Sequence, residues 1–300
     1  MNRRLFLQNT SLALGGLMLQ SNQIISNSLF QNPYKIKLVR GGVSAFSEKG
    51  GTIAFLQTKN NFVVVDSQFQ EQSNHLITEL KKLSLNPIKF LINTHHHGDH
   101  TSGNIAFKGL VEHVVAHENS LKNQKKSAID NENENKQLYP DVTFSKNWSA
   151  KVDDETIKAH YFGAAHTNGD VLIHFEKANI VHMGDLTVNR RYPYIDKSAG
   201  ADIKNWIKVL DKANSTFDKD AIFIFGHAFD PEKITGNKED INVFKDYLEK
   251  LLIHVDQDIK AGKSKEEIMK ITAINGVTEI KGDGILRSLT AAYEELTVKL

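Results

Sequence analysis

Four of the thirteen histidines lie within six residues, in the segment LINTHHHGDH (residues 91–100). Side chains two residues apart in an extended chain point to the same side. His95 and His97 can therefore bind one ion together, while His96 faces elsewhere. Histidine pairs of this kind are typical of transition-metal sites.

The residues that follow extend this prediction to a second ion. Gly98 allows the backbone to turn sharply, which directs Asp99 and His100 toward a second position a few ångströms away. The chain contains no cysteine, so a metal must be held by histidine and carboxylate rather than thiolate. Nitrogen and oxygen ligands suit Zn²⁺, with Mn²⁺ or Fe as alternatives.

Three further candidate ligands follow other apolar runs. His166 lies in GAAHTNGD, Asp185 follows IVHMG, and His227 follows IFIFG. Each would stand at or just beyond the end of a strand. Because α/β folds place their sites at such strand ends, we expect these side chains to converge with the histidine cluster on one edge of a sheet.

The elements that position these residues are short alternating strands and longer amphipathic helices. The predicted strands cover residues 35–46, 51–58, 61–66, 88–93, 112–117, 155–162, 170–176, 178–185 and 221–227. Helices are expected over 71–84, from about 102, over 202–213 and over most of 238–300, with a break near 276–284. The polar segment 120–137 favours a solvated helix or loop, and a flap over the site is the alternative. No Pro-, Gly- or Ser-rich linker divides the chain, so one mixed α/β domain over residues 30–300 is the simplest interpretation.

The first 26 residues have a different character. Paired arginines, Arg3 and Arg4, precede a weakly apolar run without acidic residues. The segment resembles a twin-arginine export signal, which predicts a periplasmic or extracellular protein. The run is too short to span a bilayer, so no stable membrane insertion is expected. The formal net charge of +1 gives no electrostatic footprint for nucleic acid.

The pattern His-x-His-x-Asp-His after an apolar strand resembles the signature of the metallo-β-lactamase superfamily, and His166, Asp185 and His227 follow in that superfamily's order. The resemblance implies an αββα four-layer sandwich, extended here by C-terminal helices. It implies that His95, His97 and His166 hold one metal. It also implies that Asp99, His100 and His227 hold a second metal and that Asp185 bridges the two.

The implied activity is that of a dinuclear zinc hydrolase, with two Zn²⁺ per chain. Metal-bound hydroxide would attack an ester, lactone, thioester or β-lactam carbonyl, and Asp99 would orient the hydroxide and deliver a proton. The absence of cysteine excludes the β-lactamase subclasses with a cysteine ligand, and Asp185 favours the thioesterase and lactonase branches. The alternative is a mononuclear iron enzyme similar to persulfide dioxygenases, or a non-hydrolytic metal-binding member of the fold.

The segment LTVNRRYPYIDKSAG, beginning at Leu186, resembles one in the exported β-lactamase-like branch and should line the cleft. There, Arg190 or Arg191 could hold an anionic group of a small-molecule substrate, while Tyr192 and Tyr194 could form walls. A structural loop is the alternative. Neither the substrate nor the oligomeric state follows from these patterns.

Other residues are assigned no ligand role. Asp66, at the end of FVVVD, either accepts a hydrogen bond from the histidine loop or simply forms a turn. The remaining strand histidines are expected to be packing or surface groups, and they are His113, His117, His160, His174 and His182.

Overall fold

The computed structural model describes residues 32–297. The chain divides into a unit of residues 1–35 and a unit of residues 36–300, and the second carries the fold described below. The predicted export signal, residues 1–26, lies outside the described residues.

A seven-stranded sheet has its strands in chain order. They are β1 (Lys35–Arg40), β2 (Val43–Ser47), β3 (Ile53–Gln57), β4 (Phe62–Val65), β5 (Ile88–Ile92), β6 (Val111–His117) and β7 (Val142–Phe144). Strands β2 to β4 pair antiparallel, whereas β4 to β7 pair parallel. The carboxyl ends of the parallel strands therefore meet at one edge, and the histidine cluster follows β5 there.

A second sheet of six strands has the order β15-β13-β11-β10-β9-β8. Its strands are β8 (Asn147–Val152), β9 (Glu155–His160), β10 (Leu172–Phe175), β11 (Ile180–His182), β13 (Ile222–Ile224) and β15 (Thr235–Gly236). A further short pair joins β12 (Val188–Asn189) to β14 (His227–Ala228). Since β11 and β13 are parallel, Asp185 and His227 leave the sheet at the same edge.

The two sheets pack face to face, and the alternation of apolar side chains shows this directly. On β10, Ile173 joins a core that also contains Val63 and Ile92 from the first sheet, whereas Leu172 joins a core on the opposite face. That opposite face is covered by helices, including Trp206 of α5 (Ile203–Thr216). The burial of both faces requires layers on both sides of the second sheet.

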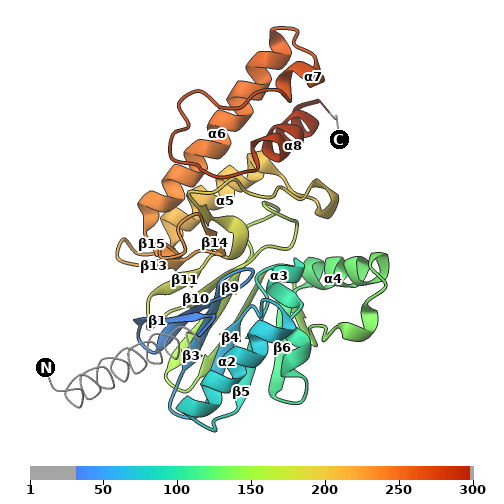
Figure 1. Cartoon of the computed structure of the whole chain (residues 1–300). Helices are drawn as coiled ribbons and strands as arrows, with labels where there is room; N and C mark the ends of the chain where they lie inside the picture. Colours follow the sequence, from blue (N-terminus) through green and yellow to red (C-terminus); the bar gives the residue numbers. More distant parts are fainter. Residues whose placement is uncertain (1–31, 298–300) are drawn as a thin grey trace, which may run out of the picture. The chain divides into compact units, whose positions relative to one another are not determined.

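Helices cover the outer faces of both sheets (Figure 1). On the first sheet, α2 (Gln70–Leu83) lies against β4 and β5, where Ile77 and Leu80 line a cavity together with Phe62 and Ile88. On the second sheet, α5, α6 (Lys238–Lys260) and α8 (Ile285–Thr297) share one apolar core. The predicted αββα sandwich with a helical C-terminal extension is confirmed.

The remaining helices complete the chain. They are α3 (Gly98–Thr101), α4 (Glu118–Asp130) and α7 (Lys265–Ile268), with the 3-10 helices η1 (Asn104–Phe107), η2 (Glu134–Lys136), η3 (Gly184–Leu186) and η4 (Lys197–Ala199). The helix expected from about residue 102 is instead a single turn, α3, that begins at Gly98 and is followed by η1. The polar segment 120–137 is mostly helical, as α4 and η2. Strands β7, β8, β12 and β15 were not predicted, and the strand predicted over residues 35–46 is divided into β1 and β2.

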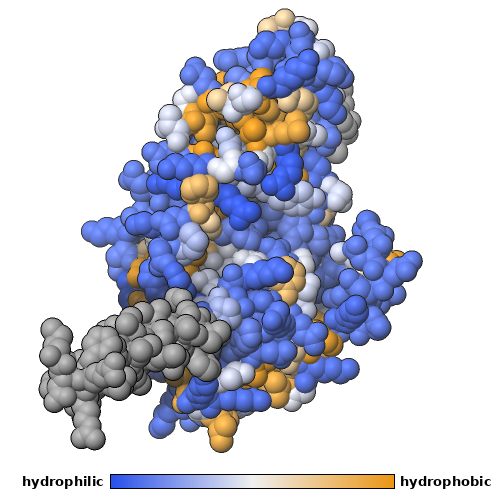
Figure 2. All heavy atoms as spheres, in the orientation of Figure 1, coloured by the Kyte–Doolittle hydropathy of each residue, from blue (hydrophilic) through white to orange (hydrophobic). Residues whose placement is uncertain are grey.

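Most of the surface in Figure 2 is hydrophilic, and apolar side chains gather over the C-terminal helices. Ile253 of α6 and Leu286 of α8 are exposed. Within residues 32–297, no helix is both long and apolar enough to cross a bilayer.

Candidate metal centre

The structure gathers the seven predicted ligands into two neighbouring groups. One consists of His95, His97, His166 and Asp185, and the other of Asp99, His100 and His227; within each group the ligand atoms lie within 4.8 Å of one another. The five strand histidines that were assigned no ligand role belong to neither group. Residues from four separate stretches of the chain therefore meet at one place.

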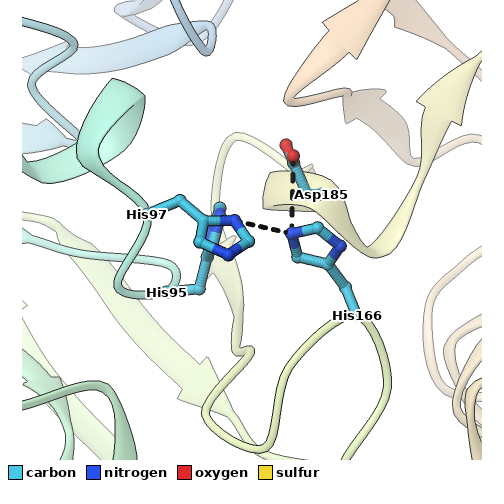
Figure 3. Close-up of side chains that lie close together, drawn as sticks. All are labelled: His95, His97, His166 and Asp185. Atoms are coloured by element: carbon cyan, nitrogen blue, oxygen red, sulfur yellow. Dashed lines mark hydrogen bonds and ion pairs between the residues drawn. The ribbon is translucent and has the colours of Figure 1, made fainter. Parts of the chain in front are cut away.

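The first group presents three imidazole nitrogens and a carboxylate to a common centre (Figure 3). Nδ1 of His97 lies 3.1 Å from Nε2 of His95 and 3.0 Å from Nε2 of His166. Three nitrogens bound tetrahedrally to zinc at 2.0–2.1 Å would be about 3.3 Å apart. The spacing observed is therefore close to that of a zinc site.

The opposite nitrogen of each ring is held from outside the centre. Nδ1 of His166 donates to the carbonyl oxygen of Tyr194 at 2.6 Å, because a carbonyl can only accept. Nε2 of His97 lies 2.9 Å from Oδ2 of Asp196, and Nδ1 of His95 lies 3.1 Å from the hydroxyl of Thr94. With the outward N–H engaged, the inward nitrogen keeps its lone pair for a metal.

His100 in the second group is held in the same way. Its Nδ1 donates to Oδ2 of Asp66 at 2.8 Å, while its Nε2 lies 3.4 Å from Nε2 of His227. Asp66 also accepts from the backbone N–H and the hydroxyl of Thr94, both at 2.8 Å. The expected role of Asp66 as an acceptor for the histidine loop is thus confirmed, and this buried carboxylate links the two groups through Thr94.

Asp185 lies between the groups. Its Oδ1 is 3.2 Å from Nε2 of His100, and its Oδ2 is 3.5 Å from Nε2 of His227 and 3.7 Å from Nε2 of His166. Oδ1 is buried, and its contact with His100 lacks hydrogen-bond geometry, so it has no hydrogen-bond partner among the described residues. A buried carboxylate oxygen without a donor is costly, so this atom is suited to a cation.

Gly226 makes room for that carboxylate. A Cβ at this position would lie 2.1 Å from Oδ1 of Asp185, closer than any real contact allows. The backbone is fixed there, because Gly226 N donates to the carbonyl of Gly184 at 2.8 Å and Thr52 N donates to the carbonyl of Gly226 at 2.7 Å.

Burial and neighbouring charges shift the pKa values of the candidate ligand histidines. Burial lowers the pKa of His95 well below its ordinary value, with a further contribution from His100. Burial and the neighbouring His97 lower the pKa of His166 to about 3. Both imidazoles are therefore neutral at pH 7, as metal ligands must be. Burial also lowers the pKa of His100, but the charges of Asp185 and Asp66 outweigh it and raise that pKa well above its usual value. The negative charges that favour a protonated His100 also favour a metal cation at this place.

Asp196 is a site residue that the sequence patterns did not single out. Its Oδ2 lies 2.9 Å from Nε2 of His97 and 3.7 Å from Nε2 of His96. His96, predicted not to be a ligand, forms a third His/Asp group with these two residues. We assign this group to the support of His97, because Nδ1 of His97 is directed into the first metal group.

A cavity of about 360 Å³ opens beside the centre. It is lined by His97, Gly98, Asp99, Asp185, Val188, Arg191, Tyr192, Tyr194, His227 and Arg287. The sequence prediction of a cleft lined by Arg191, Tyr192 and Tyr194 therefore matches the position of these residues. Arg190 lies elsewhere, because its guanidinium is 3.2 Å from both Asp240 and Glu279 and lines a separate cavity.

Arg287, from α8, is a charged lining residue that was not predicted. It stands almost a hundred residues beyond Arg191 in the chain, and no local motif surrounds it. Only the tertiary packing of the C-terminal helices brings it to the cavity.

Comparison with known proteins agrees with this geometry. The profile described as the metallo-beta-lactamase superfamily matches residues 48–227. Metallo-beta-lactamase IND-1 from Chryseobacterium indologenes is 23% identical over 190 residues, which are 62% of this chain and 75% of that protein.

Two solved structures share the fold. A metallo-beta-lactamase from Pontibacter korlensis superposes with a TM-score of 0.61 at 20% identity, over 72% of this chain and 99% of the other. A double mutant of the sec-alkyl sulfatase PisA1 gives a TM-score of 0.70 at 13% identity, over 88% of this chain and 50% of the other. With its family profile matched over more than half of its length, this chain belongs to the metallo-beta-lactamase superfamily.

Proposed function

We propose that this protein is a hydrolase that uses two divalent cations, most naturally Zn²⁺, to cleave an ester, lactone, thioester or β-lactam bond of a small molecule. One observation supports it above all. Four of the candidate histidines, His95, His97, His100 and His166, each have one ring nitrogen engaged by a polar group outside the centre and the other directed into it.

Two cations bound here would activate a water molecule and polarise the bond to be cleaved. The chain supplies the groups around them. Asp99 lines the cavity, and its side chain is 33% exposed, more than that of any other carboxylate in the two groups. Burial raises the pKa of Asp99, but the hydrogen bond with His227 and the charge of His100 outweigh it and lower the pKa to about 2. The carboxylate is thus ionised at neutral pH, so it can accept a hydrogen bond from water and orient it.

The second group favours two cations over one. A mononuclear iron enzyme needs only the first group, yet Asp99, His100 and His227 are gathered within 4.8 Å of one another. The donor set also contains more imidazole nitrogen than carboxylate, which suits zinc.

Metal analysis of the purified protein tests the proposal. About two Zn per chain, with hydrolysis of at least one member of a panel of lactams, lactones, thioesters and sulfate or phosphate esters, would support it. Loss of that activity with a chelator and its return with Zn²⁺ would connect the two results. One Fe per chain with oxygen consumption would instead support the iron enzyme.

We further propose that the protein is exported through its twin-arginine-like leader. Replacing Arg3 and Arg4 together by lysine should retain the protein inside the cell, as measured by fractionation. Export of the double variant at the normal rate would contradict this proposal.

A further inference from the structure

The charges in the cavity are unevenly distributed. Its carboxylates, Asp99 and Asp185, belong to the metal groups. The remaining charged lining residues are Arg191 and Arg287, and both are cations. With divalent cations in the centre as well, the net field in the cavity would be positive.

The two arginines differ from the others in the part of the chain that the structure describes. Arg40 donates to the backbone carbonyls of Ala178 and Asp220, and Arg190 is paired with two carboxylates. Arg191 and Arg287 form neither a hydrogen bond nor an ion pair through their guanidinium groups with residues 32–297. Among the described residues, the two arginines whose guanidinium groups have no protein partner thus line the same cavity.

Backbone geometry separates Arg191 from its neighbour. Arg190 has a φ of 55°, and its carbonyl accepts from the N–H of Lys281 at 2.9 Å. Arg191 continues this contact as a parallel bridge to Lys281. The C-terminal extension therefore holds the segment that turns Arg190 toward one cavity and Arg191 toward another.

Arg287 is positioned by the same extension. A Cβ added at Gly284 would lie 2.8 Å from Cβ of Tyr192 and 3.3 Å from Nη2 of Arg287. Because Gly284 has no side chain, the guanidinium can lie close to the segment that carries Tyr192. Farther along α8, Glu295 accepts from the N–H groups of Ile203 and Lys204 at 2.8 and 2.9 Å, which fixes the helix to the start of α5.

We infer that Arg191 and Arg287 form an oxyanion-binding subsite and that the substrate is a small organic anion. The planar guanidinium binds carboxylate, sulfonate or phosphate oxygens through paired hydrogen bonds. The anionic group would lie on the arginine side of the cavity, and the bond to be cleaved would face the metal groups. Tyr192, Tyr194 and Val188 supply the less polar surface between them. The hydrolysis of this anion depends on the proposed function. The binding of its anionic group by the two arginines depends only on the geometry of the cavity.

Kinetics with matched esters test it in the zinc-loaded, full-length protein. The substrates are 4-nitrophenyl butyrate, which is neutral, and the 4-nitrophenyl monoesters of succinate, glutarate and adipate, which carry a carboxylate at increasing distances. The wild type should prefer at least one anionic ester in kcat/KM. Arg191→Gln and Arg287→Gln should each raise KM for that ester about tenfold or more and leave the neutral ester within about twofold.

Two further variants control for charge and geometry. Arg190→Gln removes the same charge one residue away but outside the cavity, so the preference for anionic esters should persist. Arg287→Lys keeps the charge without the paired hydrogen bonds, so it should recover only part of the loss. Equal effects of the Arg191 and Arg287 variants on neutral and anionic esters, or no preference in the wild type, would overturn the subsite.

Binding measurements separate this inference from the proposed function. If the zinc-loaded protein hydrolyses no ester, the proposed function fails, and calorimetry with glutarate, propanesulfonate and propylphosphonate decides the subsite by itself. Weaker binding in both Arg191→Gln and Arg287→Gln than in the wild type and Arg190→Gln would support it. Unchanged binding of all three anions would refute it. The anion whose affinity falls most in Arg191→Gln and Arg287→Gln identifies the kind of oxyanion that the two arginines bind.

Discussion

The positions of single atoms support the proposed metal centre, and those of Asp185 connect its two groups. Its carboxylate lies near histidines of both metal groups, and its buried Oδ1 has no partner in hydrogen-bond geometry among the described residues. A bridging carboxylate would neutralise part of the charge of two cations that are otherwise held mainly by neutral imidazoles.

The variant Asp185→Asn tests this role. We expect it to bind metal more weakly and to turn over substrate more slowly, because an amide cannot neutralise the cations. The loss of affinity should exceed the 10–100-fold typical of losing a hydrogen-bond partner of a ligand. Metal content after dialysis and the rate on the best substrate measure both effects, and unchanged values would remove Asp185 from the site.

Replacing Asp196 tests whether its contact with Nε2 of His97 strengthens metal binding by that histidine. In Asp196→Asn, the hydrogen bond to Nε2 of His97 loses its charge, so the affinity of the first group for metal should fall about 10–100-fold. Competition with a chelating dye measures that affinity. Ser198→Ala is the matched control, because its hydroxyl donates to Oδ1 of the same carboxylate at 2.6 Å without touching the histidine. Equal affinity in both variants would mean that Asp196 has only a structural role.

At the scale of elements, α8 connects the C-terminal extension to the site. It carries Arg287 near its beginning and Glu295 near its end. Glu295 caps α5 with both oxygens and also pairs with Lys197 at 3.1 Å. The side chain of Glu295 is only 8% exposed, so these bonds lie largely out of water.

Replacing Glu295 by Ala should therefore lower the free energy of unfolding by about 1–3 kcal/mol, since two N–H groups of α5 lose their acceptor. Urea unfolding measures this loss. Glu294→Ala is a suitable control, because its side chain makes no such cap. A similar loss in both variants would show that packing of α8, rather than the cap, holds the helix.

Sequence patterns predict elements well where an apolar run ends in a ligand, as for β5, β11 and β13. They failed where the pattern is weak. β8, with the sequence NWSAKV, has mostly exposed or half-buried residues and little apolar alternation, and β7 has only three residues. The turn that carries Gly98 and Asp99 has no helical periodicity, because its side chains serve the site rather than a core.

Site residues that depend on contacts between distant segments could not be predicted from local sequence patterns. The order of the histidines and aspartates predicted which side chains the structure brings together, because the histidine motif is local and the order follows that of a known family. The roles of Asp196 and Arg287 could not be predicted, because each depends on packing against a segment about a hundred residues away.

At the scale of the whole molecule, the region matched by the family profile and the C-terminal extension both line one cavity. The family profile ends at residue 227, yet Arg287 of the extension lines the same cavity as His97 and Asp99. The extension shares its apolar core with the second sheet, including Phe223 of β13. Packing of the extension therefore affects both the stability of the second sheet and the shape of the cavity.

Metal removal tests whether bound cations stabilise the fold. Cations that bind the folded chain and not the unfolded one would each add about 2.7 kcal/mol to stability when the free metal is 100 times its Kd. For a protein of this size, a chelator should then lower Tm by roughly 4–5 °C for each cation lost. Thermal unfolding with and without EDTA measures the shift, and added Zn²⁺ should reverse it. The Asp185→Asn variant, which starts with less metal, should show a smaller shift. Identical Tm values for the metal-loaded and chelated wild type would mean that the buried His/Asp groups are satisfied without a cation, contrary to the geometry of Asp185.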